Sequence, residues 1–278
     1  MKNYTLIGHP LGHSMSPLIH NELFKLKGRD CIYNLTDIAP EKLSECGEFL
    51  RRFSGFNITI PHKVNVIKLI DELAESAKRY NSVNCVDCKD GRLIGYNTDC
   101  DGFLLSTKEF PLDKNVLLIG CGGVGRMMAI EVALHGGNLT IGIIPEAADT
   151  AEKLKAEIIN IVPDTSVEIL LISELKGGFD VIINASPVGM YPKVQACPVS
   201  DEIISSCSYV FDAVYNPVET QLIKKAVSMG KTAVGGAAML VYQAVKAHEI
   251  WDGDFYTDEE VNRIIKAVEE KVRQGEVK

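Results

Sequence analysis

Apolar and polar residues follow one another along the chain in a pattern that predicts alternating strands and helices. The first strand-like run covers residues 2–8. Ser16 and Pro17 then open a helix, with the serine as its N-cap and the proline in its first turn. Further along, the pattern predicts a strand near residues 31–35, a helix near 41–53 and a strand at 56–60 that ends before a proline.

The next two apolar runs form a predicted hairpin. They cover residues 82–88 and 93–96, and Asp90-Gly91 between them is typical of a two-residue turn joining antiparallel strands. From residue 115 onward the pattern changes to a regular succession of strands and helices. The strands fall at 116–119, 139–144, 167–172, 181–183, 210–211 and 231–234, and the helices at 124–134, 147–161 and 220–229. Such a succession indicates a doubly wound parallel sheet.

The fold class that follows is α/β, with two α/β domains. Residues 1–103 are expected to form an N-terminal domain, and residues 104–236 a Rossmann-like dinucleotide-binding domain. Two further helices, near 237–250 and 258–273, are expected to return to the first domain, since the middle segment already makes a complete nucleotide-binding unit. A length of 278 residues agrees with two domains.

Composition and charge narrow the class of function. The formal charge is 29 − 37 = −8, so the chain offers no basic surface for nucleic acid or an anionic membrane. An acidic protein with an anionic substrate must bind that substrate at a local site.

No apolar run reaches the roughly 18 residues that span a bilayer, and the N-terminal segment lacks the pattern of a signal peptide. Eight scattered cysteines with no export signal favour reduced thiols and a cytoplasmic location. Cys85 and Cys88 have no second ligand pair, so no metal site is expected.

Glycines at 120, 122, 123 and 125 follow a predicted strand and open a predicted helix. Gly120-Cys121-Gly122-Gly123-Val124-Gly125 therefore has the context of a dinucleotide fingerprint. Glycine allows the backbone to approach a pyrophosphate closely, and the helix start offers unpaired N–H groups. The alternative is a glycine-rich turn that binds nothing.

The residue that would read the adenosine ribose is less clear. It is expected at the end of the next strand, where the chain has Ile143-Ile144-Pro145-Glu146. Glu146 is suited to a 2′-hydroxyl, which would favour NAD, although an acid in the first turn of a helix is equally ordinary. No arginine is present there for a 2′-phosphate, and Lys153 and Lys155 lie too far into the helix.

Polar residues gather at the strand ends of the first domain. Ser14 and Ser16 stand beside a helix start, which suits a carboxylate, although Ser16 alone could be only an N-cap. Thr59 shares a strand face with a neighbouring asparagine, and Lys63 follows just past the strand end. Asp99 ends another strand. A lysine and an aspartate from separate strand ends suit proton transfer, although a surface salt bridge would explain either residue alone.

These segments together resemble the shikimate dehydrogenase family along nearly the whole chain. The matching motifs are His13-Ser14-Met15-Ser16-Pro17, residues 57–63, Ser82-Val83-Asn84, residues 95–99, the glycine loop, residues 183–190, Tyr215-Asn216-Pro217 and residues 236–243. The resemblance implies the reversible, dinucleotide-dependent reduction of 3-dehydroshikimate to shikimate, in the pathway to chorismate and the aromatic amino acids. It implies that residues 1–103, completed by the C-terminal helices within 237–278, form a substrate-binding domain, and that the active site lies in the cleft between the two domains. It also implies a small-molecule partner, with a monomer and a homodimer both open. NADP is the family's usual cofactor, and NAD stays possible.

The resemblance also implies roles for single residues. Lys63 would transfer the proton, with Asp99 paired to it. The substrate carboxylate and ring hydroxyls would be held by Ser14, Ser16, Tyr215, Thr59, Asn84, Asp99 and Gln243. The dinucleotide would be held by Gly120, Gly122, Gly123, Val124 and Gly125 and, at its nicotinamide end, by Ser186, Val214, Gly236 and Met239.

The chain departs from the family pattern at three places. The usual Asn-Arg-Thr that meets the 2′-phosphate is replaced by Ile143-Ile144-Pro145, Ala238 stands at a common glycine, and Cys100 follows Asp99 where glycine is usual. A quinate or dual quinate/shikimate dehydrogenase is the nearest alternative. From another class, a metabolite sensor without catalysis would fit the lost phosphate motif, but the intact Lys63, Asp99 and glycine loop argue against it.

Overall fold

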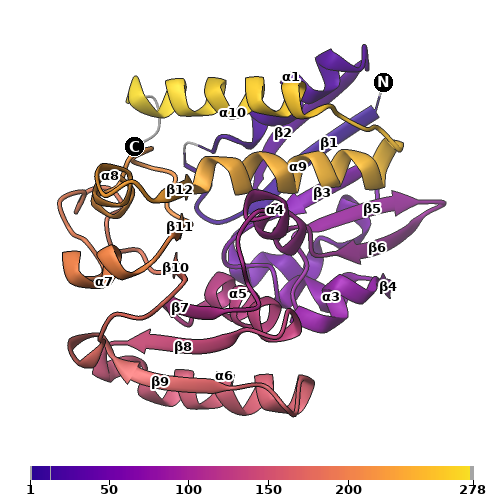
Figure 1. The fold of residues 1–278 in the computed structure, drawn as a ribbon. Coiled ribbons are helices and arrows are strands. Elements are labelled where there is room, and N and C mark those ends of the chain that lie inside the picture. The colour runs from indigo at the N-terminus through magenta and orange to yellow at the C-terminus, as the bar shows by residue number, and fades with distance from the viewer. Residues whose placement is uncertain (1, 13, 276–278) are drawn as a thin grey trace. The chain divides into compact units, whose positions relative to one another are not determined.

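The computed structural model describes residues 2–12 and 14–275. His13 of the first motif lies outside these residues. The chain divides into two units, and the unit boundaries fall within helices α4 (Asp99–Ser106) and α9 (Gly236–Asp252). The first unit comprises the chain up to Gly102 and the segment from Leu240 on, and the second runs from Phe103 to Met239. Figure 1 traces both along the chain.

The first unit is built on a mixed sheet in the strand order β2-β1-β3-β5-β6-β4 (Figure 1). Its strands are β1 (Lys2–Gly8), β2 (Cys31–Asp37), β3 (Gly55–Ile58), β4 (Glu72–Leu73), β5 (Cys85–Lys89) and β6 (Arg92–Tyr96). Its other helices are α1 (Ser16–Leu26), α2 (Gly47–Leu50), α3 (Glu75–Tyr80) and α10 (Asp258–Arg273). β1 pairs in parallel with β2 and β3, whereas β5 runs antiparallel to both β3 and β6.

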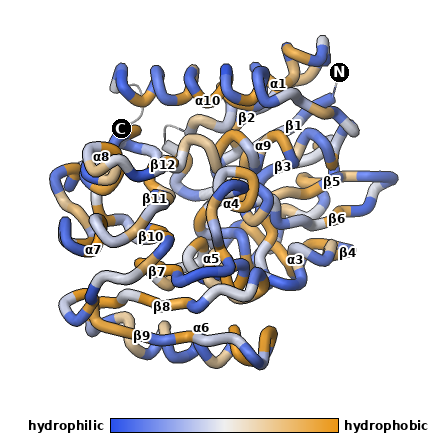
Figure 2. The backbone as a smooth tube through the Cα atoms, in the orientation of Figure 1, coloured by the Kyte–Doolittle hydropathy of each residue, from blue (hydrophilic) through white to orange (hydrophobic). Residues whose placement is uncertain are grey.

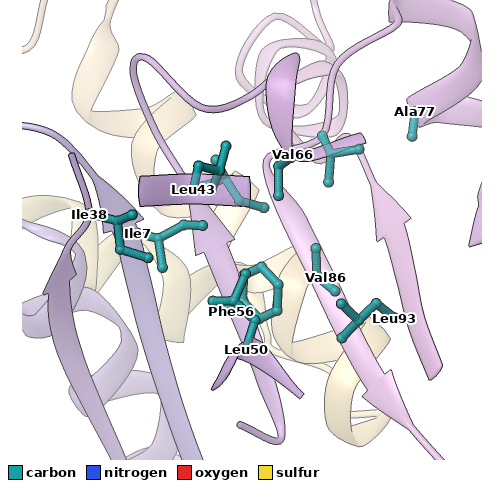
Figure 3. Packing of buried hydrophobic residues seen from close by; sticks show 11 residues of the cluster. Ile7, Ile38, Leu43, Leu50, Phe56, Val66, Ala77, Val86 and Leu93 are labelled. Atoms are coloured by element: carbon teal, nitrogen blue, oxygen red, sulfur yellow. The ribbon is translucent and has the colours of Figure 1, made fainter. Parts of the chain in front are cut away.

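Alternation along β1 divides its side chains between two cores. Tyr4 and Leu6 pack on one face with Phe24 of α1 and Trp251 of α9. Ile7, on the opposite face, belongs to the cluster drawn in Figure 3, where side chains from strands and from the short helical turns meet. Because strand side chains alternate between faces, one apolar run supplies both layers.

The second unit contains a wholly parallel sheet in the order β12-β11-β10-β7-β8-β9. Its strands are β7 (Asn115–Ile119), β8 (Asn138–Ile143), β9 (Val167–Leu171), β10 (Val181–Asn184), β11 (Tyr209–Asp212) and β12 (Thr232–Gly235). Its helices are α5 (Gly123–Leu134), α6 (Ala148–Ile161), α7 (Asp201–Ser206) and α8 (Gln221–Ser228). The order reverses at β7 and β10, which is the switch point where doubly wound folds bind ligands.

Helix α10 illustrates how the pattern of the sequence becomes packing. Figure 2 shows hydrophilic and hydrophobic residues alternating along it from turn to turn. Its apolar stripe buries Val261, Ile264, Val268 and Val272. Thr257 and Glu260 form a capping box at its start, which satisfies two N–H groups that would otherwise lack partners. Within the described part of the chain, no helix is long and apolar enough to cross a membrane.

The α/β fold and the hairpin are confirmed. Asp90 and Gly91 both have positive φ, 52° and 76°, as a two-residue hairpin turn requires. The single helix expected at 41–53 is wrong: a 3-10 turn, Pro40–Glu45, ends at Cys46 before the short helix α2 begins. The short elements β4, α3, α4 and α7 were not predicted.

The expectation that Ser16 caps α1 is also wrong. Met15 occupies the N-cap position with a nearly helical backbone, and Ser16 is the first residue of the helix. The Ser16 N–H donates instead to Ser14 Oγ at 3.2 Å. Pro17 lies in the first turn, as expected.

Candidate active site

Three polar residues of the first unit meet in one hydrogen-bonded cluster. The Lys63 ammonium donates to Asp99 Oδ2 at 2.6 Å, and Asn84 Nδ2 donates to Asp99 Oδ1 at 2.8 Å. Both carboxylate oxygens therefore have a donor. The side chains of Lys63 and Asp99 are 25% and 16% exposed, so the pair is shielded from bulk water but still open on one side.

The backbone around the cluster holds these side chains in place. The amide N–H of Val83 donates to the carbonyl oxygen of Lys63 at 2.8 Å, which ties the segment after β3 to the approach of β5. Asn84 Oδ1 accepts the N–H of Thr98 at 2.6 Å, and Asn97 Oδ1 accepts the N–H of Asp99 at 3.1 Å. Each asparagine thus links a strand end to the start of α4. The arrangement gives an ammonium that can donate a proton and a carboxylate that orients it.

The two serines lie together at the start of α1. Ser16 is buried and Ser14 is half-buried. Burial raises the pKa of the Tyr33 phenol well above its usual value. A hydrogen bond between the side chains of Ser16 and Tyr33 acts in the opposite direction and lowers this pKa. A helix start with two hydroxyls is suited to a carboxylate.

A buried link between the serines and the Lys63 cluster was not predicted. The Tyr33 hydroxyl donates to Asn57 Oδ1 at 2.8 Å, and Asn57 Nδ2 donates to the Asn84 carbonyl oxygen at 3.2 Å. Asn57 is only 4% exposed, so its amide is one of the few polar groups in this part of the core. An asparagine within an otherwise apolar strand was the available signal, because a buried amide needs hydrogen-bond partners.

Two other expected substrate residues occupy different places in the unit. Thr59 follows β3, and its N–H donates to the Ile7 carbonyl oxygen at 2.9 Å. A Cβ at Gly8 would lie 2.5 Å from Thr59 Cγ2, so only glycine fits beside this threonine. Gln243 lies on α9, where its Nε2 donates to the Leu240 carbonyl oxygen at 2.9 Å.

The glycine loop of the second unit fits a pyrophosphate. Gly120 has φ +97°, and a Cβ at Gly125 would lie 2.1 Å from the Gly120 carbonyl oxygen, so both positions require glycine. Gly122 and Gly123 face open space, with nothing within 4 Å of a Cβ built on them. Val124 is half-buried behind them in the first turn of α5, which no side chain caps. Free N–H groups at an uncapped helix start, beside bare backbone, are what a phosphate needs.

The residues expected at the nicotinamide end lie at the ends of the neighbouring strands. Ser186 donates from its N–H and its hydroxyl to Asn184 Oδ1, at 3.1 and 2.7 Å. The N–H of Gly236 donates to the Val214 carbonyl oxygen at 3.2 Å, and a Cβ at Gly236 would lie 2.3 Å from the Ala213 carbonyl oxygen. Met239 follows, buried in the first turn of α9.

Tyr215 also belongs to the second unit, after β11. Burial raises the pKa of its phenol, which keeps the hydroxyl protonated and able to donate a hydrogen bond. Of the predicted substrate residues, the structure joins Lys63, Asn84 and Asp99 directly. Ser14 and Ser16 contact each other.

The described segment that follows β8, Ile144-Pro145-Glu146, where an adenosine ribose is expected, contains no lysine or arginine. Ile144 is 55% exposed, and Glu146 lies in the exposed turn Pro145–Ala147. Arg126, in the first turns of α5, donates through its Nε to Glu157 of α6 at 2.8 Å.

Comparison with known proteins places this geometry in a family. The model of the "Shikimate dehydrogenase substrate binding domain" matches residues 6–86. A shikimate dehydrogenase (NADP⁺) of Methanocaldococcus jannaschii is 37% identical over 254 residues, covering 89% of this chain and 90% of its own length. A crystal structure of a shikimate dehydrogenase in complex with NADP⁺ superimposes with a TM-score of 0.87 at 35% identity, over 96% of this chain and 95% of the other.

A second solved structure is similar in fold. The shikimate 5-dehydrogenase of Thermus thermophilus, in complex with NADP(H) and shikimate, has a TM-score of 0.85 at 27% identity, over 96% of this chain and 100% of the other. Sequence and fold thus agree over almost the whole length of the relatives. The chain belongs to the shikimate dehydrogenase family.

Proposed function

We propose that the chain is a shikimate dehydrogenase that reversibly reduces 3-dehydroshikimate to shikimate with a nicotinamide dinucleotide. The observation that carries the proposal is the cluster of Lys63, Asn84 and Asp99, in which an ammonium is held at 2.6 Å from an oriented carboxylate. Its named relatives support the same reaction, since the relative from Methanocaldococcus jannaschii bears the name of an NADP⁺-dependent enzyme.

In the reductive direction Lys63 donates a proton to the carbonyl oxygen that becomes the new hydroxyl. In the oxidative direction the same nitrogen accepts the proton of that hydroxyl. The ammonium form is the one that Asp99 stabilises, so the oxidative step needs a route by which the proton leaves, such as a water relay. Asp99 orients the ammonium, and Asn84 fixes the second oxygen of Asp99.

The substrate carboxylate is assigned to the hydroxyls of Ser14 and Ser16 at the start of α1, with Tyr215 as a further donor. The ring hydroxyls are assigned to Thr59, Asn84, Asp99 and Gln243. These groups offer donors and acceptors but no apolar wall, which suits a polyhydroxylated acid.

A bound nicotinamide dinucleotide supplies or accepts the hydride. Gly120, Gly122, Gly123, Val124 and Gly125 hold its pyrophosphate through backbone N–H groups. Ser186, Val214, Gly236 and Met239 are assigned to its nicotinamide end. NADP is the first cofactor to expect from the relatives, with NAD second.

Initial rates with shikimate and with quinate, each with NADP⁺ and NAD⁺, test the proposal. Shikimate should give the higher kcat/KM, followed through the absorbance of the reduced nicotinamide. A higher kcat/KM with quinate would make the chain a quinate or dual dehydrogenase. A folded protein that binds shikimate but reduces neither cofactor would be a sensor and not an enzyme.

A further inference from the structure

Asp212, at the end of β11, is a fully buried carboxylate with three donors. Its Oδ1 accepts from Asn184 Nδ2 at 2.9 Å and from the N–H of Val214 at 3.0 Å. Its Oδ2 accepts from Thr220 Oγ1 at 2.6 Å. All three contacts point hydrogens at the carboxylate, so the ionised form is the one that the surroundings satisfy.

The charge of Asp212 has no cation beside it. Within the described part of its unit, no lysine, arginine or histidine forms an ion pair with this carboxylate. Burial raises the pKa of Asp212, and the hydrogen bonds from Thr220, Val214 and Asn184 offset only part of that rise. A negative charge in this setting acts over a longer range than one at the surface, because little water screens it.

The same carboxylate organises the loops after two adjacent strands. Asn184, at the end of β10, uses its amide nitrogen for Asp212 and the Val188 carbonyl oxygen, and its oxygen for Ser186. Thr220 bonds Asp212 while its oxygen caps α8 by accepting the Ile223 N–H. Asp212 thus fixes the loop after β10 through Asn184 and the loop after β11 directly.

Sheet order shows which half of a dinucleotide would approach these loops. β7, which leads into the glycine loop, lies between β8 and β10, and β11 follows β10. The adenosine ribose of a Rossmann ligand is read at the end of the strand corresponding to β8. The other half of the ligand must therefore extend toward the ends of β10 and β11. A Cβ at Gly120 would lie 2.9 Å from the Ser186 N–H nitrogen, so the glycine loop and the loop after β10 are in direct contact.

We propose that Asp212 is a positioning residue of the dinucleotide site whose buried negative charge favours the oxidised nicotinamide over the reduced one. The oxidised ring carries a positive charge and the reduced ring is neutral, so a nearby buried anion stabilises only the oxidised form. The inference rests on the proposed function, because it requires a dinucleotide at this edge of the sheet. The inference goes beyond the proposed function, because it assigns a role to a residue that would not touch substrate.

The test compares the Kd of NADP⁺ with the Kd of NADPH, each measured by fluorescence or calorimetric titration without substrate. Asp212→Asn removes the charge at nearly constant volume, and Asp212→Ser is a second neutral variant should the first fail to fold. Either variant should raise the ratio of the NADP⁺ Kd to the NADPH Kd by at least about threefold, as expected for the loss of a buried charge at moderate range.

Two control variants separate charge from packing. Thr220→Val removes a donor but leaves the carboxylate, so it should weaken both cofactors alike and leave the ratio unchanged. Asp180 lies just before the first residue of β10, at the end of the sheet where the strands begin, and it accepts the Asn115 N–H. Asp180→Asn therefore removes a carboxylate far from the proposed nicotinamide end and should change neither Kd.

An unchanged ratio in both Asp212 variants, with both affinities lowered equally, would show that Asp212 is only structural and would overturn the inference. The proposed function would stand if the wild type still oxidised shikimate. A wild-type protein that bound neither form of the cofactor would instead refute the proposed function itself.

Discussion

Lys63 lies in the turn after β3 and Asp99 is the first residue of α4, 36 residues further along the chain, and their charged groups meet at 2.6 Å. Asn84 holds the second oxygen of Asp99, so the carboxylate cannot rotate away from the ammonium without losing a hydrogen bond at 2.8 Å. An ammonium held beside a fixed carboxylate is a proton donor in a defined position, which suits general acid–base catalysis.

Lys63→Ala should lower kcat by about 10²–10⁴-fold with a much smaller effect on KM, as for the loss of a general acid–base group. Steady-state rates with shikimate and NADP⁺ measure both constants. Lys68→Ala is the matched control, since Lys68 is a lysine of the neighbouring turn Asn65–Leu69 and lies outside the cluster. A Lys63→Ala enzyme with a kcat near that of the wild type would remove Lys63 from the mechanism.

Asp99→Asn should also lower kcat, because the ammonium would lose the charged partner that orients it. The variant keeps the volume of the side chain, so the free energy of unfolding should change less than the activation free energy calculated from kcat. Urea unfolding and steady-state rates measure the two changes. A loss of kcat without a matching loss of stability distinguishes lost orientation of Lys63 from misfolding.

Ser14→Ala and Ser16→Ala should weaken shikimate binding by about 1–3 kcal/mol each, the range for a hydrogen bond to a charged group. The KM and Kd of shikimate should rise while those of the cofactor stay constant. Thr257→Ala is the control, because Thr257 is a true N-cap, of α10. It should cost about 1 kcal/mol of stability without changing either KM. An unchanged KM for shikimate in both serine variants would contradict the carboxylate assignment.

Local patterns predicted those parts of the fold that depend on neighbours in sequence. The alternation of β1, the turn at Asp90-Gly91 and the glycine loop each follow from a few adjacent residues. The helix expected at 41–53 failed for the same reason, since its apolar spacing is compatible with a 3-10 turn followed by a short helix, and only packing in the cluster around Leu43 and Leu50 decides between them.

The site was predictable where each polar residue stood in a recognisable local motif. Lys63 and Asp99 were identified as a pair, and the structure brings them together. The links through Tyr33, Asn57 and Asp212 were not, because each joins separate segments that no local motif marks as neighbours. Asp212 ends an apolar strand, and an acid in that place looks like an ordinary strand end until the structure shows that it is buried.

A pair of buried histidines in the first unit predicts how stability depends on pH. Tyr256 donates to the Leu23 carbonyl oxygen at 3.1 Å, so its oxygen accepts from His248 Nδ1 at 2.8 Å. His248 Nε2 must then accept from His20 Nδ1 at 3.0 Å. This order of donors leaves the His248 ring neutral, and burial keeps the His20 ring neutral as well. Burial lowers the pKa of both, that of His248 to about 3, although Asp252 and Asp254 act in the opposite direction on His248.

Each depressed pKa makes the unfolded state bind protons first as the pH falls. The free energy of unfolding is therefore highest above the histidine pKa of the unfolded chain, near 6.5. Below that pH it declines, by about 2 kcal/mol per histidine between roughly pH 7.5 and pH 5. Urea unfolding at the two pH values measures the loss. The His248→Gln variant should lose about half as much stability between the two pH values as the wild type. The His135→Gln variant, changed at a histidine whose side chain is 44% exposed, should lose as much as the wild type. The same loss in all three proteins would assign the pH dependence to other groups.

The last prediction concerns the choice of cofactor. β8 ends before Ile144, which is 55% exposed, and Glu146 follows in an exposed turn. No guanidinium is available at this position for a 2′-phosphate, and a carboxylate pointing inward would repel one. The pyrophosphate site at Gly120–Gly125 is the same for both cofactors. Preference for NADP should therefore be weaker than in relatives that place an arginine here.

Ile144→Arg should move the ratio of kcat/KM for NADP⁺ over NAD⁺ toward NADP⁺ by roughly 10- to 150-fold, the value of a charge-assisted phosphate contact of about 1.5–3 kcal/mol. Ile159→Arg is the matched control, since Ile159 is an exposed isoleucine, 40% accessible, near the far end of α6. It should leave the ratio unchanged. A wild-type enzyme that already prefers NADP⁺ a hundredfold or so would mean that another residue, such as Lys153, reads the phosphate. In that case the strand end at Ile144 would not be the specificity site, and the substituted arginine would add little.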